Sequence, residues 1–176
     1  MREMTVYGVS FDIVGKQPIV LLKTAEGNTF LPIWIGHPEA AAILMKLQGS
    51  EPPRPLTHDL ACSIVHSLDG EITRVTVTEL REQTYHAQIT IVQDGKEIEI
   101  DSRTSDAIAL ALRTDAKIFA ADDVIEESGV EFDGDEPELE HGVATPTSLG
   151  EVDLGEFRRF LDTVSPDEFR TEDSED

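Results

Sequence analysis

The sequence predicts an α+β fold that is internally duplicated, with each half formed by a three-strand meander followed by helices. Three observations lead to this prediction. Strand-like runs occur in two sets of three, an apolar helix follows each set, and 39% hydrophobic residues in a chain of 176 suffice for one core with a tail. We expect a mixed or antiparallel sheet and a disordered acidic C-terminal tail.

The first half opens with three runs rich in Val, Ile, Leu, Tyr and Phe, a composition typical of strands. They are residues 4–14, 18–24 and 29–35. Gly15 lies between the first two runs, and Gly27 and Asn28 lie between the second and third. Because glycine and asparagine adopt the positive φ angles of tight hairpins, we predict an antiparallel meander.

Two helices follow in the first half. Pro38 suits a first helical turn and Glu39 suits the positive end of the helix dipole, so one helix is predicted from Pro38 to Leu47. After a proline-rich connector, Thr57 is expected to cap a second helix that reaches about Leu68. The apolar residues of this second helix recur at helical spacing: Leu60, Ile64, Val65 and Leu68.

The second half repeats this order of elements. Its predicted elements are strands at 71–80, 84–93 and 97–101, a helix at 105–114, a strand at 117–120 and a helix at 122–127. Asp94 and Gly95 are predicted to form the hairpin turn between the last two strands of the set. The helix at 105–114 is apolar on every side, which predicts that it lies inside the fold.

The helix that follows each meander begins in the same way. Glu39 precedes Ala40 in the first half, and Asp106 precedes Ala107 in the second. This similarity indicates a duplicated domain. The alternative is that similar helix propensities produce similar helix starts without a duplication.

The chain is predicted to divide into three parts. Residues 1–130 form the domain. Residues 131–151 are acidic, contain glycine and proline and have few large apolar residues, which is typical of a disordered linker. Residues 152–176 contain a short amphipathic helix, and we expect a protein partner to bind through residues 152–170.

The charge of the chain lies mostly at its C-terminal end. The net charge is -22, of which residues 1–120 contribute -5 and residues 121–176 contribute -17. Proteins that bind nucleic acid without help normally use several basic contacts to phosphates. The charge distribution therefore argues against unaided binding of polyanions.

The sequence also excludes several classes of protein. Its longest apolar runs are six residues, against about 18 in a membrane helix, and the N-terminus lacks the apolar core of a signal peptide. We therefore expect a cytoplasmic protein that does not bind membranes. The single cysteine, Cys62, cannot form an internal disulfide, and Trp34 is expected to pack in the core.

Two polar clusters lie where extended chain changes to helix, at residues 54–59 and 101–106. One interpretation is catalytic: carboxylates hold Mg²⁺ or another divalent cation, His58 acts as a general acid or base, and neighbouring polar side chains hold a phosphate. The metal ligands would be Asp59, Asp101 and Asp106, and the substrate-binding residues Arg54, Arg103 and Ser105. The alternative is structural, with the same side chains acting as helix caps, dipole partners and ion pairs.

Four motifs of the sequence resemble the bifunctional nuclease family. They are Leu-Pro-Ile-Trp-Ile-Gly at 31–36 with Glu-Ala at 39–40, Arg-Pro-Leu-Thr-His-Asp-Leu at 54–60, Tyr-His-Ala at 85–87, and Ile-Asp-Ser-Arg-Thr-Ser-Asp-Ala-Ile-Ala-Leu-Ala at 100–111. The resemblance implies an α+β fold with repeated halves, a cytoplasmic setting, self-association, and a nuclease that degrades both DNA and RNA. Thr104 departs from the family, which usually has proline there, and this change is expected to loosen the turn.

Two functions from different classes follow from these features. The first is a metal-assisted nuclease of low sequence specificity, in which His58, Asp59, Asp101 and Asp106 are catalytic. The second is a non-catalytic homo-oligomeric binding or regulatory module, whose acidic tail binds a partner.

Overall fold

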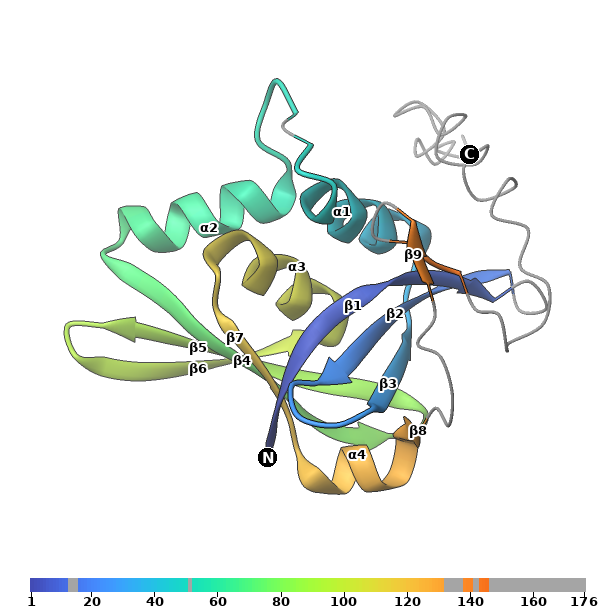
Figure 1. The fold of residues 1–176 in the computed structure, drawn as a ribbon. Coiled ribbons are helices and arrows are strands. Elements are labelled where there is room, and N and C mark those ends of the chain that lie inside the picture. The colour runs from blue at the N-terminus through green and yellow to red at the C-terminus, as the bar shows by residue number, and fades with distance from the viewer. Residues whose placement is uncertain (13–15, 51, 132–137, 141–142, 146–176) are drawn as a thin grey trace, which may run out of the picture.

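The structure, a computed structural model, describes residues 1–12, 16–50, 52–131, 138–140 and 143–145 (Figure 1). Its helices are α1 (His37–Leu47), α2 (Thr57–Ser67), α3 (Thr104–Thr114) and α4 (Asp122–Ser128). Its strands are β1 (Arg2–Asp12), β2 (Gln17–Thr24), β3 (Thr29–Trp34), β4 (Gly70–Arg81), β5 (Thr84–Gln93), β6 (Lys96–Arg103), β7 (Lys117–Ala120), β8 (Val130–Glu131), β9 (Glu138–Glu140) and β10 (Val143–Thr145).

Two antiparallel meanders flank a central strand in one mixed sheet. The main strand order is β6-β5-β4-β7-β1-β2-β3-β8, with β7 parallel to β4 and antiparallel to β1. Ile118 of β7 is in register with Met4 of β1 and with Val75 of β4, and all three side chains are buried. The predicted α+β fold with two meanders is confirmed, and one core joins its halves.

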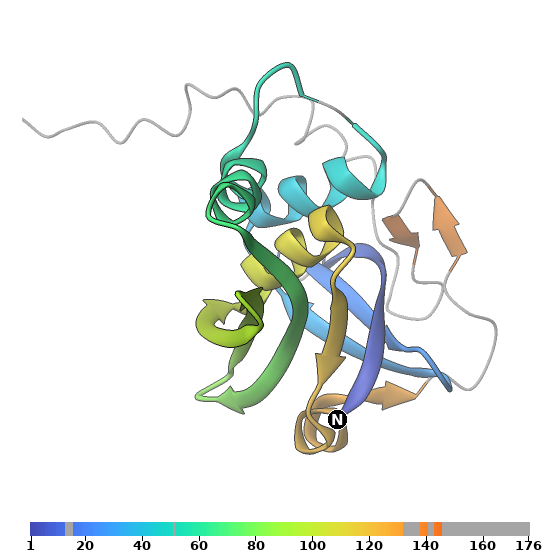
Figure 2. The same cartoon turned by 90° about the vertical axis from the view of Figure 1, so that its left-hand side faces the viewer.

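Three helices form a layer on one face of the sheet (Figure 2). The middle one, α3, packs against both α1 and α2, and its apolar residues are buried: Ala107, Ile108, Ala109, Leu110 and Ala111. This confirms the prediction that a helix without a polar face lies inside the fold. α3 therefore places the polar residues of its first turn between the starts of its two neighbours.

Helix α2 differs from the sequence prediction in two respects. Its apolar residues have the predicted helical spacing, but Leu60, Ile64 and Leu68 point to solvent, and no residue of α2 is buried. The helix contacts the core through Ala61 and Val65 on its other side. Thr57, the expected cap, is the first helical residue, and Leu56 occupies the N-cap position.

The hairpin turns use positive backbone φ angles. Asp94 (φ 50°) and Gly95 (φ 73°) form the turn predicted between β5 and β6. The turn between β4 and β5 has the same backbone form at Glu82 (φ 49°) and Gln83 (φ 61°). Neither glutamate nor glutamine is typical of this conformation, so these residues did not predict a turn there.

The segment predicted as a disordered linker contains two short strands. β9 pairs with β10, and Val143 of β10 lies in parallel register with Val9 of β1. β7 pairs only with Arg2–Met4 of β1, so the same edge of β1 is open further along for β10. The predicted amphipathic helix at 152–176 lies outside the described residues, as does the expected disorder of the tail.

Within the described parts of the chain, no helix has the length and apolar character that crossing a membrane would require.

Candidate functional site

A histidine and an aspartate from two different helices form a hydrogen-bonded pair. His58 lies in the first turn of α2 and Asp106 in the first turn of α3, 48 residues further along the chain. The Nε2 atom of His58 lies 3.0 Å from Oδ1 of Asp106. The side chain of His58 is 15% exposed, so solvent reaches the imidazole.

Arg103 extends this pair to a third helix. Its Nε donates to Oδ2 of Asp106 at 2.8 Å, and its Nη1 donates to Oε1 of Glu39 at 2.9 Å. Glu39 lies in the first turn of α1. Four side chains thus connect the starts of three helices. We term them the His58 cluster: Glu39, His58, Arg103 and Asp106.

Gly36 and Thr104 lie next to residues of the His58 cluster, and each has a local structural role there. A Cβ atom at Gly36 would lie 2.2 Å from Oε2 of Glu39, so glycine leaves room for that carboxylate beside the start of α1. Thr104 is buried, and its hydroxyl donates to the carbonyl oxygen of Tyr85 at 3.1 Å. The turn that was expected to be loosened by Thr104 is instead joined to β5 by this hydrogen bond.

The electrostatics of the His58 cluster fix the proton positions. Partial burial disfavours ionisation of Asp106, but the hydrogen bonds from Arg103 and His58 outweigh it and lower the pKa of the Asp106 carboxyl below 3.8. The same pairing with Asp106 raises the pKa of Arg103. Since an ionised carboxylate only accepts hydrogen bonds, Nε2 of His58 is the donor of this pair, and in a neutral imidazole Nδ1 is then the nitrogen with the free lone pair.

Asp59 belongs to a separate ion pair. Its Oδ1 accepts a hydrogen bond from Nε of Arg113 at 2.6 Å, and its Oδ2 accepts one from the backbone N–H of Leu56 at 2.8 Å. Burial disfavours ionisation of Asp59, but these two donors lower the pKa of its carboxyl. Asp59 thus caps the start of α2 and forms an ion pair, which are the roles that the structural interpretation of the polar clusters expected.

Arg113 was missed by the sequence prediction. Its side chain is only 7% exposed, and it also donates to the carbonyl oxygens of Ala109 and Ala42. It therefore links α1, α2 and α3. The available signal was a single arginine in the last turn of an otherwise apolar helix.

The three predicted metal ligands do not form one set. Asp59 and Asp106 are held in different ion pairs, and Asp101 is exposed on the edge strand β6, opposite Gln88 of β5. Across the described ranges, no three His, Cys, Asp or Glu side chains are grouped so that they could hold a metal ion. The residues described do not fit the predicted three-carboxylate site for Mg²⁺.

Two predicted substrate-binding residues, Arg54 and Ser105, form no hydrogen bond or ion pair with His58 or Asp106 in the described parts of the chain. Arg54 is exposed in the connector before α2, and no described residue forms an ion pair with it. Ser105 is buried at the start of α3 and lines a cavity of about 350 Å³. Of the three predicted substrate-binding residues, only Arg103 contacts the pair formed by His58 and Asp106.

This cavity has an aromatic wall beside the His58 cluster. It is lined by Trp34, Tyr85, Arg103, Glu39 and Ser105, among others. Trp34 is 51% exposed, so the expectation that it packs in the core was wrong. The alternation along β3 buries Ile33, and Ile35 is buried beyond the strand, while Trp34 between them takes the opposite side.

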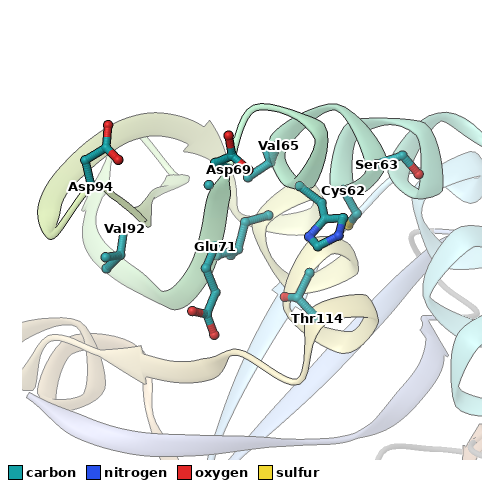
Figure 3. A pocket seen from close by; sticks show the side chains of 11 residues that line it. Cys62, Ser63, Val65, Asp69, Glu71, Val92, Asp94 and Thr114 are labelled. Atoms are coloured by element: carbon teal, nitrogen blue, oxygen red, sulfur yellow. The ribbon is translucent and has the colours of Figure 1, made fainter.

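A second cavity lies at the other end of α2 (Figure 3). It has a volume of about 790 Å³ and is lined by Cys62 and Ser63 of α2, Glu71 of β4 and Thr114 of α3, with Asp69 and Asp94 at its turns. Its lining contains acidic side chains and no lysine or arginine. None of the predicted site residues lines this cavity, and its charge does not suit a polyanion.

The fold and the His58 cluster define an α+β protein with a polar site at the starts of three packed helices. Comparison with known proteins shows its family. Residues 20–133 match the bifunctional nuclease domain, and the chain belongs to this family. This confirms the resemblance carried by the four sequence motifs.

Two mycobacterial proteins are similar to the chain over nearly its whole length. They are the uncharacterized protein MT1877 of Mycobacterium tuberculosis strain CDC 1551 and the uncharacterized protein Rv1829 of strain H37Rv. Each is 38% identical over 170 residues, which covers 97% of this chain and 99% of the relative. The similarity therefore includes the acidic C-terminal region as well as the domain.

Proposed function

We propose that the protein is a nuclease of low sequence specificity that hydrolyses phosphodiester bonds of DNA and RNA. The observation that carries this proposal is the hydrogen bond from Nε2 of His58 to Asp106, with Arg103 on the same carboxylate. Membership of the bifunctional nuclease domain family supports the same class of reaction. No described contact of the His58 cluster selects one base or one sugar.

In this proposal His58 is the general base. Asp106 holds the imidazole with its proton on Nε2, and Nδ1 has no hydrogen-bond partner within the described ranges. Nδ1 accepts a proton from the attacking water while the water oxygen bonds to phosphorus. The ester bond from phosphorus to oxygen breaks, the leaving oxygen takes a proton from solvent, and Nδ1 of His58 then returns its proton to solvent. Asp106 acts through His58 and is a positioning residue.

Arg103 and Trp34 supply the contacts to the nucleic acid. The side chain of Arg103 is 67% exposed, and its guanidinium can bind a phosphate bidentately once Glu39 is displaced. Trp34 offers an aromatic face in the cavity that Arg103 also lines, and any base can stack on such a face. Stacking without base-edge contacts gives binding of low sequence specificity.

No step of the proposed mechanism depends on Mg²⁺. Among the described residues, Asp59 and Asp106 are held in different ion pairs, and in this proposal the guanidinium of Arg103 meets the charge of the phosphate. Hydrolysis measured in excess chelator is expected to persist. Loss of activity that Mg²⁺ restores would show that a cation completes the site, and would contradict this part of the proposal.

The experiment compares two histidines of the same helix. Purified protein should degrade a fluorescent single-stranded oligonucleotide, and His58→Ala should lower kcat by about 100-fold or more, the usual contribution of a general base. His66→Ala is the matched control, because His66 is exposed on α2 and lies outside the His58 cluster. Equal activity of His58→Ala and the wild type would contradict the proposal.

A second function has one observation in its favour. The charge of Arg103 is already balanced by Glu39 and Asp106, and in this alternative the two ion pairs connect α1 to α3 and bind no phosphate. The chain would then be a non-catalytic binding module whose acidic tail, outside the described residues, binds a partner. This alternative gains support if purified protein binds the oligonucleotide without cutting it, and His58→Ala leaves binding unchanged.

A further inference from the structure

The hydroxyl of Ser105 is a buried polar group that lacks a partner in the fold. The residue is only 8% exposed, and no described residue forms a hydrogen bond with its hydroxyl. Ser105 lines the cavity of about 350 Å³ beside the His58 cluster, and its oxygen is not sealed inside the protein. Because buried polar groups normally have a hydrogen-bond partner, this hydroxyl indicates that the cavity takes a ligand with a polar group.

The start of α3 favours an anion at the same place. The helix has 11 residues, of which Ser105 is the second, and none of the described side chains caps its first turn. The N–H groups of a first helical turn have no acceptor within the helix, and the helix dipole is positive at that end. Asp106, the acid of this turn, directs its carboxylate to His58 and Arg103. The hydroxyl of Ser105 and the adjacent N–H groups thus suit a phosphate.

Arg103 supplies a positive charge to the wall of this cavity. Its Nη1 donates to Oε1 of Glu39 at 2.9 Å, and both residues line the cavity. Its Nε and Nη2 donate to Asp106 at 2.8 and 3.3 Å. A carboxylate oxygen therefore already accepts from the guanidinium inside the cavity. A phosphate oxygen can replace that of Glu39 while Arg103 stays paired with Asp106.

The same cavity has aromatic side chains in its wall. Trp34 and Tyr85 line it, and Trp34 is 51% exposed. An indole ring can stack on any base. The volume of about 350 Å³ lies at the lower end of the range for sites of small organic ligands, which suits one nucleotide. An anion site and an aromatic face in one cavity match the phosphate and the base of a nucleotide.

We propose that this cavity binds a nucleoside monophosphate. The base stacks on Trp34, and the phosphate displaces Glu39 and accepts from Arg103, from the hydroxyl of Ser105 and from the N–H groups at the start of α3. A terminal phosphate presents three acceptor oxygens, one for each of these donors. One consequence rests on the proposed function: a nucleoside monophosphate is a product of complete hydrolysis of nucleic acid, and it competes with the substrate for Arg103 and Trp34.

The first test measures binding of adenosine monophosphate (AMP) through the fluorescence of Trp34. AMP should quench this fluorescence with a Kd below about 1 mM. Adenosine lacks the phosphate and inorganic phosphate lacks the base, so each should bind at least about tenfold more weakly, with inorganic phosphate measured by competition.

Three results of this first test would overturn the site or half of it. Adenosine that binds as tightly as AMP would overturn the phosphate contacts. Inorganic phosphate that binds as tightly as AMP would overturn the stacking on Trp34. AMP that does not bind at about 10 mM would overturn the site itself.

The second test changes single side chains of the phosphate site. Ser105→Ala should weaken binding of AMP about tenfold and leave binding of adenosine unchanged. It should not lower the free energy of unfolding, because none of the described residues bonds to the hydroxyl. Ser63→Ala is the matched control, since the hydroxyl of Ser63 bonds within α2 to the carbonyl oxygen of Asp59. Wild-type affinity for AMP in Ser105→Ala would overturn the role of this hydroxyl.

Glu39→Gln tests the displacement of the carboxylate. The variant removes the negative charge that competes for Arg103 and repels the phosphate, so it should strengthen binding of AMP about tenfold. Glu71→Gln, in the other cavity, should bind AMP like the wild type. Weaker binding of AMP in Glu39→Gln would overturn the proposed exchange of carboxylate for phosphate.

A third measurement separates this site from the proposed nuclease activity. AMP should inhibit hydrolysis of the oligonucleotide competitively, with an inhibition constant equal to its Kd. Protein that binds AMP in the first test but hydrolyses no oligonucleotide would contradict the nuclease and leave the nucleotide site standing. Hydrolysis that continues unchanged when AMP saturates the protein would overturn the shared use of Arg103 and Trp34.

Discussion

The guanidinium of Arg113 and the carboxylate of Asp59 lie 2.6 Å apart, Nε to Oδ1, although 54 residues separate them in sequence. Arg113 is nearly buried and also bonds carbonyl oxygens of two helices. Arg113→Met should therefore lower the free energy of unfolding by about 2–3 kcal/mol, since it leaves a carboxylate and two carbonyls without their donor. Urea denaturation at pH 7 measures the free energy of unfolding of Arg113→Met and of the wild type.

Arg103→Met is the control for that measurement. Arg103 also pairs with carboxylates, but its side chain is mostly in solvent, so its loss should cost less than about 1 kcal/mol. A loss of stability in Arg103→Met equal to that in Arg113→Met would contradict the assignment of Arg113 as the structural arginine.

The low pKa values of Asp59 and Asp106 predict sensitivity to acid. A carboxyl with a folded pKa below its unfolded value near 3.8 stabilises the fold above that value, and this stabilisation is lost as the pH falls through the folded pKa. The free energy of unfolding should therefore fall below about pH 4 more steeply in the wild type than in Asp59→Asn. Parallel pH profiles for the two proteins would contradict the low pKa of Asp59.

Trp34 is the only tryptophan in the chain, so its fluorescence reports the cavity directly. A single-stranded oligonucleotide should quench this fluorescence if a base stacks on the indole. Trp34→Ala should weaken binding by about 5–150-fold, from about 1–3 kcal/mol per stacked base, whereas Trp34→Phe should keep most of the affinity. If a saturating concentration of the oligonucleotide did not quench the fluorescence, this would show that no base stacks on Trp34.

The C-terminal region should oppose binding of nucleic acid. Residues 146–176 hold ten acidic residues and three arginines, and their removal leaves every described residue in place. The shortened chain should bind the oligonucleotide several-fold more tightly at low salt, and the difference should shrink as salt screens the charges. A gain that is the same at low and high salt would mean that the tail blocks binding by some means other than charge.

Most of the fold could be predicted from the sequence because its signals are local. Alternating or continuous apolar runs mark each main strand, and Asp94 with Gly95 specifies a tight turn. The strands β9 and β10 lacked such a signal, because each is only three residues long and shows no periodicity. They form by pairing with each other, and β10 also pairs with β1. Glu82 and Gln83 form their turn because the flanking strands pair, against their own preference.

The candidate site could be predicted only in part, because it depends on contacts between distant segments. His58, Arg103 and Asp106 were among the predicted residues, since polar side chains at helix starts are a local pattern. The sequence could not show which base each carboxylate contacts: Asp59 lies at a helix start just as Asp106 does, yet its partner is Arg113, 54 residues away. Periodicity likewise shows which residues of α2 share a face, but not that this face meets solvent.

The most direct test of the proposed nuclease is chemical rescue at His58. His58→Gly should lose activity on a single-stranded oligonucleotide, and added imidazole should restore part of kcat in proportion to its concentration without changing KM, because free imidazole can occupy the position of the missing base. The same imidazole should have no effect on the wild type. Full activity of His58→Gly without imidazole would contradict a role for His58 as the general base.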